Sequence, residues 1–182
     1  MMHRRTLLAG ALLAALPGLG YAKAQRAAAE EISRERALAT AEQKALLVFF
    51  YASWCSWCRI FDAFLADPAA AAVMSRHFRI FHLRAQEHTD ANRALQLPGA
   101  DALYLRYARD GGGLPFFVAL DAQERAVVTS ISPKTQENIG FPVAPQELDD
   151  FQGMLKRAAP AITAAELAIV RNACVRVAPR RR

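Results

Sequence analysis

The segment VFFYASWCSWCR, residues 48–59, joins an apolar run to a pair of cysteines. The run begins at Leu46 and ends at Tyr51, and its length and continuity predict a central strand covered on both faces. After Arg59, apolar residues recur with the spacing of one helix face, at Ile60, Phe61, Phe64 and Leu65. The two cysteines are therefore expected where a buried strand gives way to a helix.

The spacing of Cys55 and Cys58 suits thiol–disulfide chemistry. Cys55 lies at the expected start of the helix, where unpaired backbone amides and the helix dipole favour an anion. Its thiol should ionise more readily than a free cysteine, and the thiolate is the species that attacks. We expect Cys55, the more exposed of the two, to form a mixed disulfide with a substrate and Cys58 to resolve it.

Four other residues are candidates for substrate contact. Trp54 directly precedes Cys55 and can shield its sulfur from water, and Trp57 lies between the two cysteines; ordinary packing is the alternative for both. Far along the chain, Leu114-Pro115 follows three glycines and precedes a strand. An X–Pro bond can be cis, and a cis Pro115 beside the dithiol would leave the backbone of Leu114 free to pair with an extended peptide.

The rest of the chain predicts a single α/β domain. Helices are expected over residues 27–44, 69–77 and 146–159, and a last helix opens with a capping box at Thr163. Strands are expected over residues 79–83 and 116–120, with 126–131 returning as a hairpin partner. Residues 84–110 are expected to be a loop with a short helix, and residues 132–145 a loop.

The segment from Val48 to Arg59, together with Leu114-Pro115-Phe116-Phe117, resembles the thioredoxin family, and the resemblance extends from Ala37 to Ala159. It implies a thioredoxin-like α/β fold, in which helices flank a central mixed β-sheet. The domain would span residues 27–159, and residues 160–177 would add an extra C-terminal helix. Residues 67–78 further resemble exported thioredoxin-like domains at the carboxyl end of transmembrane disulfide-interchange reductases.

The resemblance also implies roles for individual residues. Cys55 would be the attacking thiol, Cys58 the resolving thiol and Pro115 the cis proline. One position departs from the family pattern, because Phe49 stands where many thioredoxins carry a buried aspartate beneath the dithiol. Proton transfer at Cys58 must then use water or another group.

The amino terminus predicts an export signal. His3-Arg4-Arg5 is followed by an uncharged run to Ala22, and Ala22-Lys23-Ala24 offers a small-residue cleavage site. We therefore expect residues 1–24 to be a signal peptide and the protein to be periplasmic or otherwise exported, where disulfides persist. The arginine pair leaves both the general secretory and the twin-arginine routes open. An uncleaved anchor is the alternative, although Leu7 to Leu16 is short for a span of about 20 residues.

Composition and charge exclude two classes of protein. Three cysteines among 182 residues are too few for a disulfide-stapled scaffold. Of 23 basic residues, seven lie in the first 24 and the last seven positions, which leaves 16 against 17 acidic residues in between. A basic face on the domain is unsupported, so we expect no nucleic-acid partner. Residues 178–182 are expected to be a basic disordered tail.

Other uses of the dithiol are a structural disulfide or half of a zinc site. Zinc would need two further ligands, and the spacing of His77, His82 and His88 matches no metal signature. We therefore expect no metal and no cofactor. The remaining cysteine, Cys174, lies on the apolar stripe of the last helix and is interpreted as a buried thiol, with pairing to another cysteine, for instance between chains, as the alternative.

These observations favour an exported thiol–disulfide oxidoreductase. It would reduce or exchange disulfides in protein substrates and take electrons from a membrane-bound or soluble thiol donor. Ser56-Trp57 lacks the histidine associated with strongly oxidising members of the family, which favours reduction. The alternative is a non-catalytic binding module or metallochaperone that holds Cu(I) between the two thiols.

Overall fold

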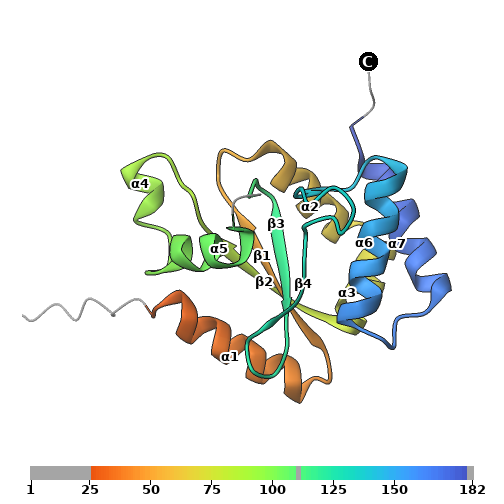
Figure 1. Cartoon of the computed structure of the whole chain (residues 1–182), viewed down its shortest axis with the longest axis horizontal. Helices are drawn as coiled ribbons and strands as arrows, with labels where there is room; N and C mark the ends of the chain where they lie inside the picture. Colours follow the sequence, from red (N-terminus) through yellow and green to blue (C-terminus); the bar gives the residue numbers. More distant parts are fainter. Residues whose placement is uncertain (1–25, 110–111, 180–182) are drawn as a thin grey trace, which may run out of the picture.

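The computed structural model describes residues 26–109 and 112–179. Its centre is a four-stranded sheet of order β2-β1-β3-β4 (Figure 1). β1 pairs parallel with β2 and antiparallel with β3, and β3 pairs antiparallel with β4, so the sheet is mixed as expected. The strands are β1 (Ala45–Tyr51), β2 (Phe78–Arg84), β3 (Phe116–Leu120) and β4 (Ala126–Thr129).

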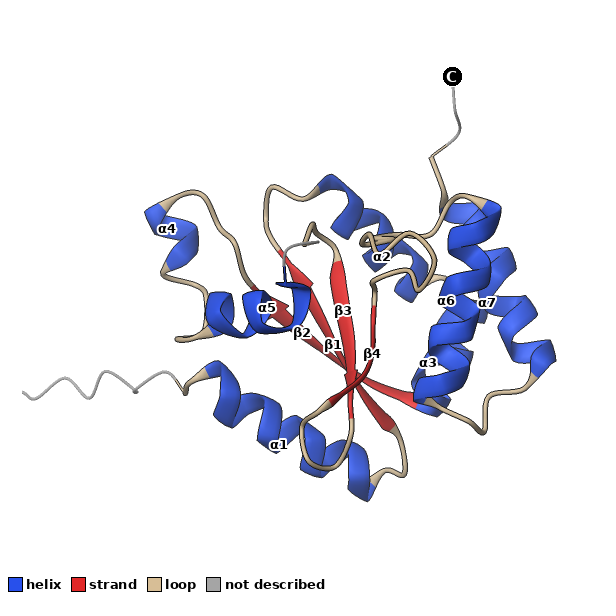
Figure 2. Ribbon diagram, viewed as in Figure 1, coloured by secondary structure: helices blue, strands red, loops and turns tan. Residues whose placement is uncertain are grey.

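Helices cover both faces of this sheet, as Figure 2 shows. One face carries α1 (Ala28–Ala41) and α5 (Ala100–Ala108), and the other carries α2 (Ser56–Ala66), α3 (Pro68–His77), α6 (Pro145–Ala158) and α7 (Ala164–Val177). A single turn, α4 (Asp90–Arg93), lies between β2 and α5. The fold is therefore a three-layer α/β arrangement of the predicted thioredoxin-like class.

β1 is buried on both sides because successive side chains point to opposite faces. Leu46, Val48 and Phe50 join the core under α1 and α5, whereas Leu47 and Phe49 join the core under the other four helices. This explains the unbroken apolar run in the sequence. The strand ends at Tyr51, and the two cysteines follow its carboxyl end at the start of α2.

At three places the structure differs from the expected elements by more than one residue. α1 ends three residues before Lys44, because Gln43 adopts a positive φ of 56° and the chain leaves the helix there. β4 ends at Thr129 rather than at residue 131, and Ile131 instead forms an isolated bridge with Asn138. Residues 84–110 contain a nine-residue helix, α5, besides the expected short one.

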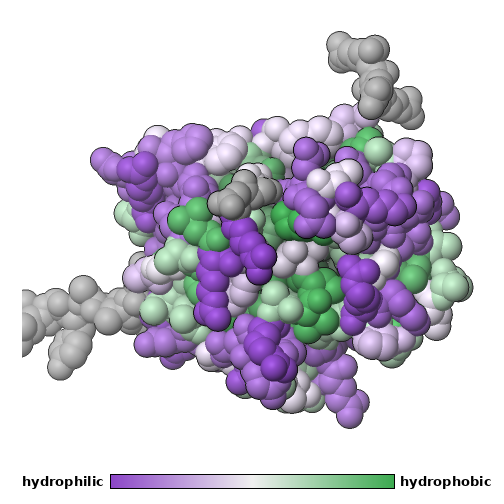
Figure 3. All heavy atoms as spheres, in the orientation of Figure 1, coloured by the Kyte–Doolittle hydropathy of each residue, from purple (hydrophilic) through white to green (hydrophobic). Residues whose placement is uncertain are grey.

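The C-terminal helices pack on the side of the sheet that carries α2. α7 contributes Val170, Ala173 and Cys174 to the same core cluster as Cys55 and Cys58. The outer face seen in Figure 3 is mostly hydrophilic, with smaller hydrophobic areas near its centre. No helix in the described part of the chain is long and apolar enough to cross a membrane.

Candidate functional site

Cys55 and Cys58 form a disulfide at the start of α2, with an S–S distance of 2.09 Å. Cys55 is the N-cap residue of this helix, as expected, and its Sγ accepts a hydrogen bond from the backbone N–H of Cys58 at 3.0 Å. An N-cap sulfur lies where unpaired helix amides point outwards, so a negative charge at Cys55 would be stabilised there. The local geometry therefore suits a nucleophilic thiolate.

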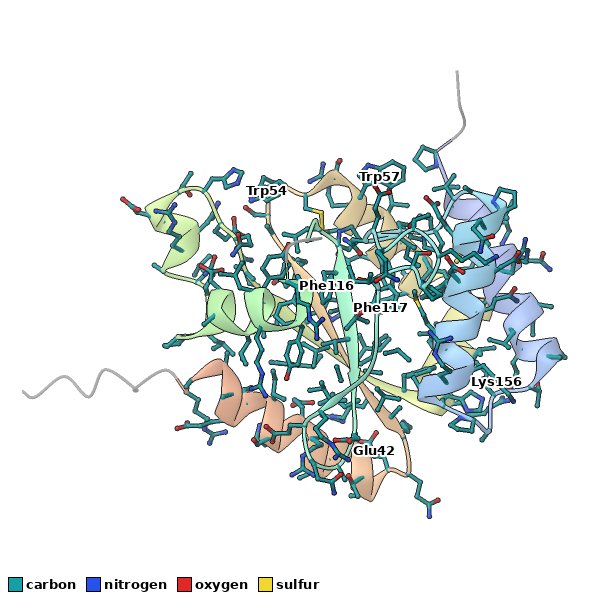
Figure 4. All side chains as sticks on the ribbon, in the orientation of Figure 1. Glu42, Trp54, Trp57, Phe116, Phe117 and Lys156 are labelled. Atoms are coloured by element: carbon teal, nitrogen blue, oxygen red, sulfur yellow. A yellow bond between two sulfur atoms is a disulfide. The ribbon has the colours of Figure 1, made fainter. Side chains whose placement is uncertain are left out.

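Cys55 is expected to be the more exposed of the two cysteines, and in this oxidised structure the difference is small. Cys55 is 3% and Cys58 2% exposed, and both belong to the main core cluster. The reason is that the bonded Cys55 sulfur lies back over the first helical turn, on the backbone of Cys58. The exposed groups at this place are the neighbouring tryptophans, Trp54 at 46% and Trp57 at 44% (Figure 4).

Phe49 occupies the same core cluster as the dithiol and is fully buried. Its ring stacks on Phe61 of α2 with a centroid distance of 4.6 Å, and the ring of His82 meets it edge-on at 5.1 Å. A phenyl ring neither donates nor accepts a proton, so this position cannot assist ionisation of Cys58.

A groove of about 810 Å³ opens beside the disulfide. Trp57 lines it together with Leu114 and Pro115, so three of the four residues expected to contact a substrate share one surface. The segment after β4 also lines the groove, with Asn138 and Phe141 among its residues. An extended segment lying in this groove would reach the helix turn that carries the dithiol.

The Leu114–Pro115 peptide bond is cis, and the neighbouring carbonyl groups are held by Asn138. Its side-chain Nδ2 donates to the carbonyl oxygens of Gly113 at 2.8 Å and Pro115 at 3.0 Å. Within residues 26–109 and 112–179, the backbone N–H and C=O of Leu114 form no hydrogen bond. An edge with free backbone groups can pair with an extended peptide.

Gly112 forms part of the same wall, and the space beside it excludes a side chain. A Cβ at this position would lie 2.3 Å from the Tyr104 hydroxyl oxygen, which is well inside van der Waals contact. The glycine therefore allows the backbone that precedes Leu114 to pass close to α5.

Trp54 lies on the other side of the disulfide from the groove and does not line it. Its indole Nε1 donates to the carbonyl oxygen of Gln86 at 2.8 Å, and its ring stacks on His88 at 4.4 Å. The loop after β2 therefore fixes this side chain, which is consistent with the packing alternative.

The three histidines have separate partners. His77 contacts Glu166 at 3.1 Å, His82 contacts Asp62 at 3.1 Å, and His88 stacks on Trp54. The described residues contain no group of three His, Cys, Asp or Glu side chains arranged to hold a metal ion. Burial raises the pKa of the free Cys174 thiol to about 12, so this sulfur stays protonated.

A thioredoxin-like family model matches residues 27–122. The chain belongs to the thioredoxin-like family. No curated protein matches its sequence.

Among solved structures, this thioredoxin-like protein is similar to a disulphide isomerase from Xylella fastidiosa, with 22% identity over 64% of this chain and 79% of the other and a TM-score of 0.44. A DsbH oxidoreductase is 19% identical over 81% of this chain and 95% of its own, with a TM-score of 0.45. The C-terminal domain of Neisseria meningitidis DsbD is 23% identical over 58% of this chain and 84% of its own, with a TM-score of 0.38.

Two polar residues of this thioredoxin-like protein escaped the sequence analysis. Asn138 bonds the loop around Pro115, and Glu87 bonds Ser53, two residues before Cys55. Each is one polar residue in a polar loop, so no local pattern distinguishes it. The expected signal peptide, Gly111 and Arg180–Arg182 of the expected tail lie outside the described residues.

Proposed function

We propose that the protein is an exported thiol–disulfide oxidoreductase that reduces or exchanges disulfides in protein substrates. The observation that supports it most is the Cys55–Cys58 disulfide at the first turn of α2, next to a groove lined by Trp57 and Pro115. Within the described residues the backbone of Leu114 forms no hydrogen bond, so it offers a pairing edge for an extended substrate segment. A dithiol and a peptide-binding edge are together what disulfide exchange on a protein requires.

The reaction begins from the reduced protein. The Cys55 thiolate attacks one sulfur of a substrate disulfide, the substrate S–S bond breaks, and the departing substrate thiolate takes up a proton. Cys58 then loses its proton and attacks the Cys55 sulfur of the mixed disulfide. The second substrate thiolate leaves and is protonated, and the Cys55–Cys58 disulfide forms. Two electrons have passed from the protein dithiol to the substrate.

The proton of Cys58 leaves without help from the position that Phe49 occupies. The groove reaches the first turn of α2 at Trp57, so water that enters with the substrate is the acceptor we propose. A dithiol partner must then reduce the Cys55–Cys58 disulfide, since the cycle consumes two electrons for each substrate bond. We propose a membrane-bound or soluble thiol donor in this role.

Variants of the three cysteines test the proposed reaction. Cys55→Ala should abolish dithiol-dependent reduction of a protein disulfide, because no other thiolate lies at the helix start. Cys58→Ala should accumulate the mixed disulfide, detected as a covalent adduct that thiols release. Cys174→Ala is the matched control and should retain turnover, since that sulfur is buried away from solvent. Turnover that survives Cys55→Ala would refute the proposal.

The direction of exchange depends on the reduction potential of the couple. We propose net reduction, since Ser56-Trp57 places no histidine between the cysteines. Equilibration with glutathione should give a potential below about −150 mV. A higher value would identify an oxidant instead.

Export is proposed from residues 1–24, which combine a positive start, an apolar run and a small-residue cleavage site. Fusing these residues to a reporter that is active only outside the cytoplasm should yield activity. Replacing Arg4 and Arg5 by lysine distinguishes the routes, because the twin-arginine route requires the arginine pair. A fusion that stays in the cytoplasm would refute the export proposal.

A further inference from the structure

Glu87 is a buried carboxylate in the loop between β2 and α4. Its side chain is 0% exposed. The carboxylate accepts two hydrogen bonds from Ser53, one from the backbone N–H and one from the hydroxyl, each at 2.7 Å. Ser53 lies two residues before Cys55, in the turn that connects β1 to α2 (Figure 1). The Glu87 side chain therefore fixes the turn that leads into Cys55.

Further contacts hold the backbone of Glu87 and the side chain of Ser53 in place. The backbone N–H of Glu87 donates to Gln96 at 2.8 Å, and its carbonyl oxygen accepts from Arg93 at 3.0 Å. Asn92 donates to the Ser53 hydroxyl oxygen at 3.0 Å. Hydrogen bonds therefore connect the loop after β2 to Ser53, in the turn that precedes Cys55. These bonds are separate from the Trp54 contacts described above.

The charge of Glu87 is only partly compensated. Among residues 26–109 and 112–179, the cation paired with this carboxylate is Arg84, at 3.3 Å, and the Arg84 side chain is 24% exposed. Burial of a charge is costly unless hydrogen bonds and an opposite charge offset it. A neutral side chain could hold the turn at lower cost, so the charge itself calls for an explanation.

We infer that Glu87 is a positioning residue for Cys55, which fixes the turn through Ser53 and uses its negative charge to limit ionisation of the Cys55 thiol. The inference rests on the proposed function, since it concerns the reactivity of the same dithiol. A nearby negative charge disfavours a thiolate, whereas the N-terminus of α2 favours it. The charge of Glu87 therefore counteracts the stabilisation that the N-terminus of α2 gives to the Cys55 thiolate. A less stabilised thiolate makes the Cys55–Cys58 couple more reducing.

Two substitutions test the sign of this effect. Glu87→Gln removes the charge, and its amide can accept only one of the two Ser53 hydrogen bonds. The pKa of Cys55 should fall by on the order of half a pH unit, and the potential of the couple should rise. Arg84→Gln leaves the carboxylate less compensated and should shift both quantities in the opposite direction.

The two quantities are measured on the purified chain. The pKa comes from the pH dependence of Cys55 alkylation by iodoacetamide, read from the mass of the modified peptide. The potential comes from equilibration with glutathione. Asp150→Asn is the matched control, because Asp150 is also buried and accepts from a serine hydroxyl, that of Ser132, at 2.6 Å. It should lower the free energy of unfolding and leave the pKa of Cys55 and the potential unchanged.

The outcomes are distinct. If Glu87→Gln lowers stability as Asp150→Asn does but moves neither the pKa nor the potential, Glu87 is merely structural and the inference is overturned. If Glu87→Gln does not fold, Arg84→Gln decides, and an unchanged Cys55 pKa overturns the inference. A wild-type chain without a reversible dithiol couple would instead refute the proposed function.

Discussion

Phe49 lies in the middle of β1 with its ring between Phe61 of α2 and His82 of β2. The ring contributes packing at the position where the resemblance to thioredoxins leads us to expect a carboxyl group. This exchange has an energetic side, since an unpaired carboxylate in this apolar cluster would be costly. It also has a chemical side, because in the proposed mechanism Cys58 gives its proton to water.

Truncating Phe49 should destabilise the fold without changing the acid–base chemistry. Phe49→Ala should lower the free energy of unfolding by about 3–5 kcal/mol, because it leaves a cavity beside Phe61. Phe49→Leu keeps most of the volume and should cost about 1–2 kcal/mol. Both values come from urea denaturation. The pH profile of exchange should be the same for Phe49→Leu as for wild type, and a shifted profile would contradict a purely packing role.

The sequence predicted the structural role of single residues where the local pattern is strong, as at helix N-caps. Cys55 is the N-cap of α2, and Thr163 begins α7 with the expected capping box. Glu87 and Asn138 were missed because their partners, Ser53 and the carbonyl groups around Pro115, are distant in the chain. The burial of Cys55 was missed for a similar reason, since the core around it is assembled from several helices.

At the scale of elements, apolar runs and turn signals predicted the four strands in the described part of the chain but not α5. Its buried residues Ala100, Tyr104 and Ala108 are four apart, which is a helical spacing. Two of the three are alanines, so the apolar signal is weak. Gly99, in a left-handed conformation at φ 83°, marks the start of the helix. The spacing could have revealed this helix, whereas its position against β1 depends on tertiary packing.

The attachment of α7 to α3 should depend on pH through Glu166. The backbone N–H of Thr163, together with His77, lowers the pKa of Glu166 to about 2 from a usual value of 4.5. A lowered pKa in the folded state means that ionised Glu166 stabilises the fold above pH 4.5. That contribution is lost as the pH falls towards 2.

Glu166→Gln measures this contribution, because glutamine retains part of the cap but cannot ionise. The variant should be less stable than wild type at pH 7, and the two chemical denaturation midpoints should converge as the pH falls from 5 to about 2. Parallel midpoints across this interval would show that Glu166 does not titrate with folding.

On the scale of the whole molecule, one core connects the dithiol to the C-terminal helices. Phe61 and Phe64 of α2 meet Phe151 of α6 at centroid distances of 6.2 and 6.0 Å. Arg176 of α7 donates to Asp67, between α2 and α3, at 2.9 Å. The sequence indicated an apolar stripe on the last helix but not its target, because a stripe shows which face is buried and not what covers it.

This shared core predicts that residues 160–177 are needed for folding and are not a removable extension. Their deletion would uncover apolar surface on α2, α3 and α6 and remove the fully buried Ile162 and Val170. Burial of one such side chain is worth about 1.5–3 kcal/mol, and a domain is stable by only about 5–15 kcal/mol. The truncated chain should lack a cooperative thermal transition in circular dichroism and tryptophan fluorescence.

As a control, Val175→Ala at a 59% exposed position should unfold nearly as wild type does, whereas Val170→Ala should unfold at a lower temperature. A truncated chain with a cooperative transition and a reversible dithiol couple would show that the catalytic unit ends at Ala159.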